Sequence, residues 1–163
     1  GNFEPHAAIN FMQRMSQLLG ESAQLLIGID QPREPALLEA AYDDKAGVSA
    51  AFAKNLLLRL QRDLAIELDP DQFSYQARWE PEHQRIAMAL VANSPQTWTA
   101  GSSSVAFTAA EPLITEYSYK YAPSDFLALA AQAGWQAAGR WCDAADHFSL
   151  HLLTQGDDAR THA

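Results

Sequence analysis

The chain has 163 residues, of which 48% are hydrophobic and 19% charged, which fits one globular domain, or a large part of one, with a single core. Eleven basic residues against 20 acidic residues give a net charge of −9, which opposes binding to nucleic acid and to anionic membrane surfaces. The single cysteine excludes an internal disulfide, and no apolar stretch approaches the ~20 residues of a membrane span. We therefore expect a soluble, cytoplasmic protein.

The N-terminal part predicts helices around one buried strand. Apolar residues at a 3.6-residue period predict a helix over Pro5–Leu19 that ends at Gly20. The continuous apolar run in Gln24–Asp30 is typical of a strand of a parallel sheet with both faces buried. Two more helices are expected over Pro35–Tyr42 and Val48–Leu64. Because the chain enters the first helix almost at once, we expect that it starts in mid-domain.

The rest of the chain predicts mostly strands. Period-two alternation and turn sequences predict strands over 73–79, 85–90, 96–99, 105–108, 113–121, 136–142 and 147–153. A fourth helix is expected over 126–133, with Ser124 as its N-cap and Gly134 at its end. Residues 154–163 predict a polar tail.

Three candidate sites of chemistry are weak on the sequence alone. His147 and His151 would lie about 13 Å apart on one strand, too far to share a metal ion. Cys142 has no activating base beside it in sequence and is predicted to be a core residue. The Asp-Pro-Asp sequence at 69–71 predicts a turn or cap and not a cation site. We therefore assign no metal and no catalytic residue.

Two polar clusters are more informative. In the segment 115–121, Glu116, Ser118 and Lys120 would share one face of a strand. A carboxylate and a hydroxyl at this spacing could bind a small ring with an N–H donor and a nitrogen acceptor. The alternative is an edge strand with a polar outer face. The second cluster, Tyr42 with the two following aspartates, is by itself a polar helix terminus.

Taken in order, these segments resemble the C-terminal half of the histidine-specific, S-adenosylmethionine-dependent methyltransferases. The matching stretches are 1–5, 25–30, 40–44, 47–52, 55–57, 85–88, 115–121 and 148–151. No one of these motifs is specific, but their order and spacing agree over nearly the whole chain. The resemblance implies an N-methyltransferase that acts on the α-amino group of L-histidine or a related amino acid, in ergothioneine biosynthesis.

The resemblance also implies an α/β fold, the C-terminal half of a class I (Rossmann-like) methyltransferase sheet with an inserted domain. The sheet would comprise residues 1–30 and 109–153, and the inserted α+β substrate-binding domain residues 31–108. The family's glycine-rich loop and its acidic ribose-binding residue have no match in this sequence. S-adenosylmethionine would then be bound by an N-terminal half that acts as this chain's partner, or the chain is a truncated product.

Site residues are carried over from the family one by one. The resemblance implies that Asn2 and Tyr42 hold the amino-acid end of the substrate and that Glu116 and Ser118 bind its imidazole ring. Met88 would lie against that ring. The competing hypothesis is a non-catalytic α+β binding module, derived from such an enzyme, that lacks the cofactor site and binds a small amine or a protein.

Overall fold

The computed structural model describes residues 1–155 and divides into two compact units. Unit 1 comprises Gly1–Arg33, Glu82–Arg85 and the chain from Ser118 onward. Unit 2 comprises Glu34–Pro81 and Ile86–Tyr117. These units are defined by contacts within the chain, so the inserted domain over 31–108 stays a prediction.

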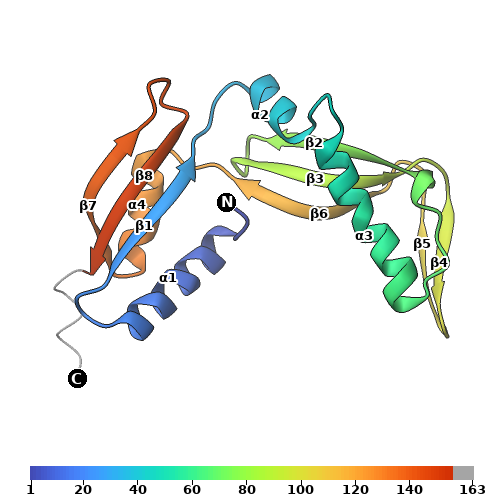
Figure 1. Ribbon diagram of the computed structural model, residues 1–163, viewed down its shortest axis with the longest axis horizontal. Helices are drawn as coiled ribbons and strands as arrows, with labels where there is room; N and C mark the ends of the chain where they lie inside the picture. The colour runs from blue at the N-terminus through green and yellow to red at the C-terminus, as the bar shows by residue number, and fades with distance from the viewer. Residues whose placement is uncertain (156–163) are drawn as a thin grey trace. The chain divides into compact units, whose positions relative to one another are not determined.

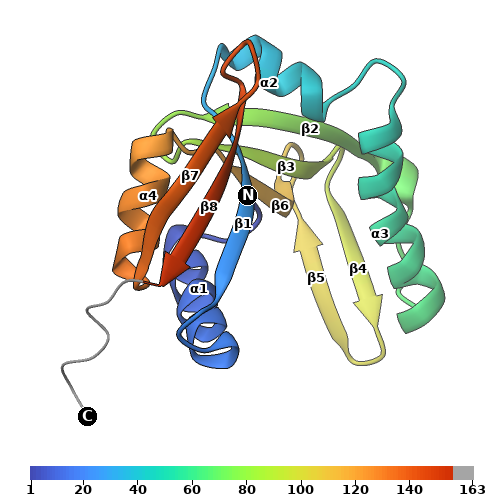
Figure 2. The same cartoon turned by 60° about the vertical axis from the view of Figure 1, so that its left-hand side comes forward.

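Unit 1 is built on one antiparallel sheet with the strand order β1-β8-β7 (Figure 1). Its elements are α1 (Pro5–Leu19), β1 (Gln24–Asp30), α4 (Pro123–Gln132), β7 (Trp135–Cys142) and β8 (Phe148–Gln155). Figure 2 shows α4 beside β7 and α1 beside β1. Both helices contribute to one hydrophobic core on the sheet, which includes Met12, Phe126, Trp135 and Leu153.

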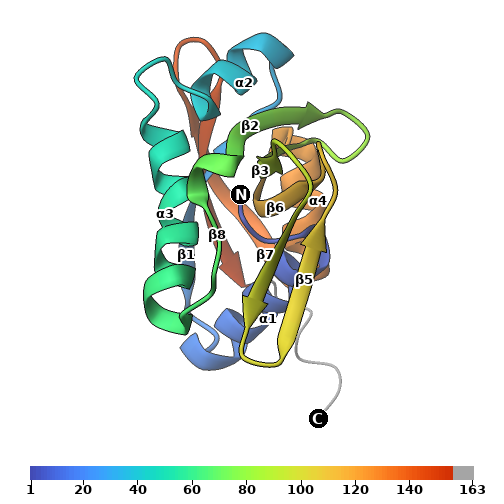
Figure 3. The ribbon, with the colours of Figure 1, turned by 90° about the vertical axis from the view of Figure 1, so that its right-hand side faces the viewer.

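Unit 2 combines two helices with two small sheets (Figure 3). Its elements are α2 (Pro35–Tyr42), α3 (Val48–Leu64), a short 3-10 helix (Pro70–Gln72), β2 (Phe73–Glu80), β3 (Arg85–Ala92), β4 (Gln96–Ala100), β5 (Ser103–Phe107) and β6 (Pro112–Tyr119). One sheet has the order β2-β3-β6 and lies mainly in unit 2, and the other is the antiparallel pair β4-β5. In one hydrophobic core of unit 2, Leu57 of α3 packs with the rings of Phe73, Trp98 and Phe107.

The start of α3 is fixed by an aspartate and a glycine. The Asp44 carboxylate accepts hydrogen bonds from the backbone N–H groups of Val48 at 3.1 Å and Ser49 at 2.8 Å. These bonds satisfy two of the N–H groups that every helix N-terminus leaves without a partner in the helix. Gly47, with φ at 72°, takes the left-handed conformation that this approach to the helix requires.

The fold class and the order of helices and strands are confirmed. Residues 1–155 form a mixed α/β structure with four α-helices and eight strands, and the first three helices have the predicted bounds. The N-cap prediction for Ser124 is wrong, because α4 begins at Pro123 after an Ala122 cap and Ser124 lies inside the helix. Proline suits the first helical position, since its φ is already helical and the N–H it lacks would have no partner in the helix.

Burial of β1 on both faces is also wrong for the described residues. The helices cover one face only, and Leu26 on the other face is 64% exposed. Within the described residues the strand pairs of this sheet are antiparallel, β1 with β8 and β8 with β7. The predicted polar tail begins too early, since Thr154 and Gln155 belong to β8, and residues 156–163 lie outside the described part.

The three weak candidates also have clear positions. Asp69 caps the 3-10 helix by accepting the Asp71 N–H at 3.0 Å, which confirms a capping turn. His147 precedes β8 and is exposed, whereas His151 is buried in the strand, so the predicted pair on one strand is wrong. Cys142 is exposed and not a core residue; it is the last residue of β7. Within residues 1–155, every helix is too short or too polar to cross a membrane.

Candidate functional site

An open pocket of about 550 Å³ lies within unit 2. Helix α3 lines it with Phe52, Leu56 and their polar neighbours Asn55 and Arg59. The sequence shows an apolar stripe on α3 that includes Phe52 and Leu56, but the fully buried α3 residue is Leu57. Part of the predicted stripe therefore borders a pocket instead of a closed core.

Two of the predicted substrate residues meet in this pocket. Met88 of β3 and Glu116 of β6 both line it, and Met88 is buried. The Thr115 hydroxyl donates a hydrogen bond to the backbone carbonyl of Met88 at 3.1 Å, which ties β6 to β3 at this point. A carboxylate and a thioether thus share one pocket, as a site for a polar ring with apolar faces requires.

Tyr75 of β2 lines the same pocket and was not identified from the sequence. Its hydroxyl donates to the backbone carbonyl of Tyr42 at 2.9 Å, so α2 is held to β2 through a predicted site residue. Burial, followed by the negative charges of Asp43 and Glu116, raises the pKa of Tyr75 to about 12. The alternation along β2 predicts that Tyr75 faces inward, and only its hydroxyl group distinguishes it from an apolar core residue.

Ser118 lies at the other end of the polar segment of β6, in unit 1. It is buried, and its hydroxyl oxygen accepts a hydrogen bond from the Lys120 ammonium at 2.7 Å. Lys120 is also buried and forms an ion pair with Asp30 at 3.0 Å. The alternative interpretation, a polar outer face in water, is therefore wrong for Ser118 and Lys120.

Asn2 lies in the segment that runs beside Ser118 in unit 1. The carbonyl of its neighbour Gly1 accepts the Tyr119 N–H at 2.8 Å. A Cβ placed on Gly1 would stand 3.1 Å from the Ser118 hydroxyl oxygen. Unit 1 therefore brings the Asn2 segment to Ser118, and unit 2 brings Met88 to Glu116.

Cys142 carries the one thiol of the chain. A hydrogen bond with Asp146, followed by desolvation, raises the pKa of the Cys142 thiol, which disfavours the nucleophilic thiolate. The described residues gather no group of three or more His, Cys, Asp or Glu side chains that could hold a metal ion.

The comparison with known proteins decides the family. A family model described as histidine-specific, SAM-dependent methyltransferase matches residues 1–155. The chain belongs to this family. A histidine N-alpha-methyltransferase of Mycolicibacterium smegmatis is 36% identical over 157 residues, which cover 95% of this chain and 49% of that relative. The resemblance seen in the sequence is thereby confirmed.

Two more distant matches cover nearly the same part of this chain. Ergothioneine biosynthesis protein 1 of Neurospora crassa is 25% identical over 169 residues, which cover 95% of this chain and 18% of that protein. A solved S-adenosylmethionine-dependent methyltransferase from Clostridium acetobutylicum overlaps 93% of this chain and 52% of its own, with a TM-score of 0.45 and 10% identity. The chain spans about half the length of the bacterial histidine methyltransferase that it matches.

Proposed function

We propose that this chain supplies the substrate-binding half of an S-adenosylmethionine-dependent N-methyltransferase. Its substrate is the α-amino group of L-histidine or of a related amino acid. The observation that carries the proposal is the family match over residues 1–155, in a chain whose Met88 and Glu116 line one open pocket. The name of the bacterial relative, histidine N-alpha-methyltransferase, supports the same substrate.

Asn2 and Tyr42 are proposed to hold the amino-acid end of the substrate. S-adenosylmethionine supplies the methyl group, and the amine that receives it must present an unprotonated lone pair. The Asn2 amide oxygen and the Tyr42 hydroxyl can accept hydrogen bonds from the amine without protonating it. Holding the amine in line with the methyl carbon lowers the entropic part of the barrier.

Glu116, Ser118 and Met88 are proposed to recognise the imidazole ring. Glu116 accepts the ring N–H, Ser118 bonds the other ring nitrogen, and Met88 lies against the ring. Two hydrogen bonds of this kind fix both the position and the tautomer of the ring. A site built to hydrogen-bond a polar ring rejects analogues without those groups by large factors.

The cofactor is assigned to the part of the enzyme outside this chain. The family's glycine-rich loop and ribose-binding acid match no residue here, so the residues present do not fit S-adenosylmethionine. An N-terminal half as partner and a cytoplasmic location belong to the same proposal.

The first test is the intact mass of the natural gene product, followed by a histidine methylation assay. We expect a product about twice as long as this chain, because the bacterial relative has that length, and methylation of histidine. A product of this chain's mass that binds histidine and transfers no methyl group would favour the binding module.

The second test is Glu116→Ala in the whole enzyme, with Glu82→Ala as the matched control. Glu82 is an exposed carboxylate in the turn between β2 and β3. Loss of a hydrogen bond to a charged group predicts that Glu116→Ala raises the KM for histidine about 10- to 100-fold. The control keeps the wild-type KM. An unchanged KM in Glu116→Ala removes Glu116 from recognition.

A further inference from the structure

Among the described residues, three polar side chains of the sheet line the unit 2 pocket: Tyr75 of β2, and Thr115 and Glu116 of β6. The Tyr75 hydroxyl donates its hydrogen to the Tyr42 carbonyl at 2.9 Å, and the Thr115 hydroxyl donates to the Met88 carbonyl at 3.1 Å. A carbonyl oxygen can only accept, so the direction of both bonds is fixed. Both hydroxyl hydrogens are therefore given to the main chain.

The sheet side of the pocket consequently offers acceptors to a ligand. A hydroxyl oxygen that donates its hydrogen keeps lone pairs that can accept, and a carboxylate has acceptors only. The other lining side chains that carry donors, Ser49, Asn55 and Arg59, all belong to α3. A polar ligand that lies against the sheet must therefore supply the hydrogens.

Tyr75 is held in this orientation from both ends of its side chain. Its ring packs against two hydrophobic clusters of unit 2, one around Leu57 and the other around Leu38. Its pKa of about 12 keeps the hydroxyl hydrogen in place at neutral pH. The hydroxyl oxygen is thus an acceptor at a fixed position, and little side-chain freedom is lost when a ligand binds to it.

The bond to Tyr42 also has a structural reason. Tyr42 is the last residue of α2, where the helix carbonyls have no partner within the helix. Turning the Tyr75 hydroxyl toward a ligand would break this bond. A ligand therefore meets the oxygen of Tyr75 and not its hydrogen.

We propose that Tyr75 is a specificity-determining residue of the substrate pocket, whose hydroxyl oxygen accepts a hydrogen bond, beside Glu116, from the N–H side of the substrate ring. This inference rests on the proposed function and deepens it. Two acceptors on one wall of the pocket select rings that carry an N–H over rings of the same shape that carry none. A ring without an N–H leaves both acceptors without a partner, which lowers its affinity.

The test compares two ligands of the whole enzyme, L-histidine and 3-(4-thiazolyl)-L-alanine. In the second ligand a sulfur atom replaces one ring nitrogen, so the ring has no N–H, while the amino-acid end is unchanged. The measured quantity is the ratio of the Kd of the thiazole ligand to the Kd of histidine, from calorimetry. We expect a wild-type ratio of at least about 10.

Tyr75→Phe removes the acceptor and keeps the ring that packs in the core. We expect this variant to lower the ratio about 3- to 10-fold, because histidine loses a hydrogen bond and the thiazole ligand does not. A merely structural role, in which Tyr75 only ties α2 to β2, would weaken both ligands by the same factor. An unchanged ratio in Tyr75→Phe therefore overturns the inference.

Glu39→Ala is the matched control for the structural role. The Glu39 carboxylate accepts the backbone N–H of Trp79 at 2.9 Å, so it also ties α2 to β2, and it lies outside the pocket lining. Glu39→Ala should keep the wild-type ratio, whatever its effect on the two separate Kd values. A ratio lowered as much as in Tyr75→Phe would show that loosening α2 alone causes the change and would overturn the inference.

Failure of this inference is distinguishable from failure of the proposed function. If Glu116→Ala lowers the ratio and Tyr75→Phe does not, the inference is overturned and the proposed function stands. If neither variant changes the affinity for histidine, both are overturned.

The wild-type enzyme gives an answer even if Tyr75→Phe does not fold. Equal binding of histidine and the thiazole ligand would overturn selection by the acceptor wall, while the methylation assay tests the proposed function separately.

Discussion

The two units bury different chemistry. The polar residues that the structure buries within 1–155 all belong to unit 1: Gln31, Ser118, Lys120, Ser149 and His151. The described buried side chains of unit 2 are hydrophobic throughout, from Leu38 to Phe107. Buried polar groups cost stability unless they are bonded, so unit 1 depends more than unit 2 on hydrogen bonds in its interior. Unit 2 is a conventional apolar core with a pocket at its side.

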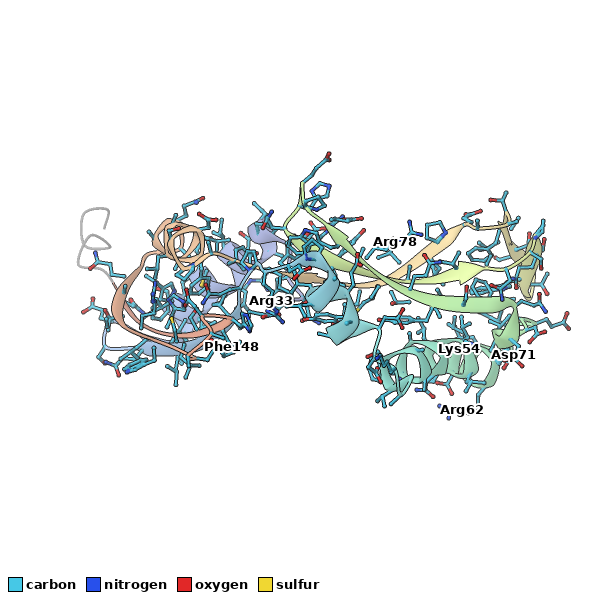
Figure 4. All side chains as sticks on the ribbon, turned by 90° about the horizontal axis from the view of Figure 1, so that it is seen from above. Arg33, Lys54, Arg62, Asp71, Arg78 and Phe148 are labelled. Carbon is cyan, nitrogen blue, oxygen red and sulfur yellow. The ribbon has the colours of Figure 1, made fainter. Side chains whose placement is uncertain are left out.

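The outer faces of the two sheets differ as well. The face of the unit 1 sheet away from its helices exposes Leu26, Trp141, Phe148 and Leu150. Phe148 approaches Gly28, where a Cβ would lie 2.5 Å from its ring. In unit 2 the outward residues of β2 are polar, and Figure 4 shows Arg78 on the side of β2 away from α3, which carries Lys54 and Arg62. Unit 1 therefore presents an apolar sheet face, whereas in unit 2 the polar side chains of β2 lie beside apolar residues of β3 and β6, among them the exposed Ile114.

The two tryptophans of β7 provide the strongest test of the covered and open faces of unit 1. Trp135 is 1% exposed, and its indole N–H donates to the Met12 carbonyl at 2.9 Å. Trp141 is 55% exposed. We expect Trp135→Ala to lower the free energy of unfolding by about 3–5 kcal/mol, because it leaves a cavity in the core. Urea denaturation measures this loss.

Trp141→Ala is the matched control, since it removes the same side chain from the same strand. We expect a loss of less than about 1 kcal/mol, because little area is taken from a packed core. Equal losses in the two variants would contradict the assignment of one covered and one open face.

The apolar core of unit 2 predicts a similar pair on α3. Leu57 is fully buried and Leu58 is 52% exposed. Leu57→Ala is expected to cost about 2–5 kcal/mol, and Leu58→Ala much less. Hydrogen exchange of the β3 amides should show the loss of protection in Leu57→Ala. If the loss of unfolding free energy caused by Leu57→Ala changed with pH, this would contradict an entirely apolar core in unit 2.

The polar core of unit 1 predicts a pH dependence instead. His151 is buried, accepts or donates a hydrogen bond with Ser149 at 2.9 Å, and packs edge-on against Phe126. Burial, followed by the charge of Arg140, lowers the pKa of His151 below its ordinary 6.5. The unfolded chain therefore takes up a proton before the folded one does, and stability should fall as the pH drops below about 6.5.

His151→Gln removes this titration, and its free energy of unfolding should vary less between pH 7 and pH 5 than that of the wild type. His147→Gln is the control, because His147 is exposed and lies outside β8. The control should retain the wild-type pH dependence. Identical pH profiles for His151→Gln and the wild type would show that His151 does not titrate in this range.

Local patterns predicted most elements, because helix and strand periodicities reflect which residues face a core. Pro5–Leu19 and Val48–Leu64 have the predicted bounds. Burial on both faces of β1 was predicted from an apolar run alone, and such a run does not show whether other elements cover one face of the strand or both. Cys142 lies opposite the buried Ser149 but ends β7 and is exposed, and a local pattern does not show how far a core extends along a strand.

The site was predictable only in part. Met88 and Glu116 came from the family resemblance and do line one pocket. The network of Asp30, Ser118 and Lys120 could not be predicted, because Asp30 is distant in sequence and its carboxylate reaches Lys120 only through the packing of β1 against the end of β6. Tyr75 was missed because strand alternation does not distinguish a core phenylalanine from a tyrosine that lines a pocket.

The N-terminus of α3 gives the smallest expected effect, and it tests whether unit 2 has a pH response of its own. Hydrogen bonds from the backbone N–H groups of Ser49 and then Val48 lower the pKa of Asp44 from 3.8 to about 2. A carboxyl group whose pKa is lower in the folded state than in the unfolded state stabilises the fold at pH values above its unfolded pKa. This stabilisation is lost as the pH falls toward 2. Asp44→Ala should therefore lower the unfolding midpoint at pH 7, and the difference from wild type should shrink between about pH 4 and pH 2.

Asp43→Ala, one residue earlier on the exposed surface, should leave the midpoint near the wild-type value. If the difference caused by Asp44→Ala does not change with pH, the cap acts through its geometry rather than its charge, and acid sensitivity would belong to unit 1 alone.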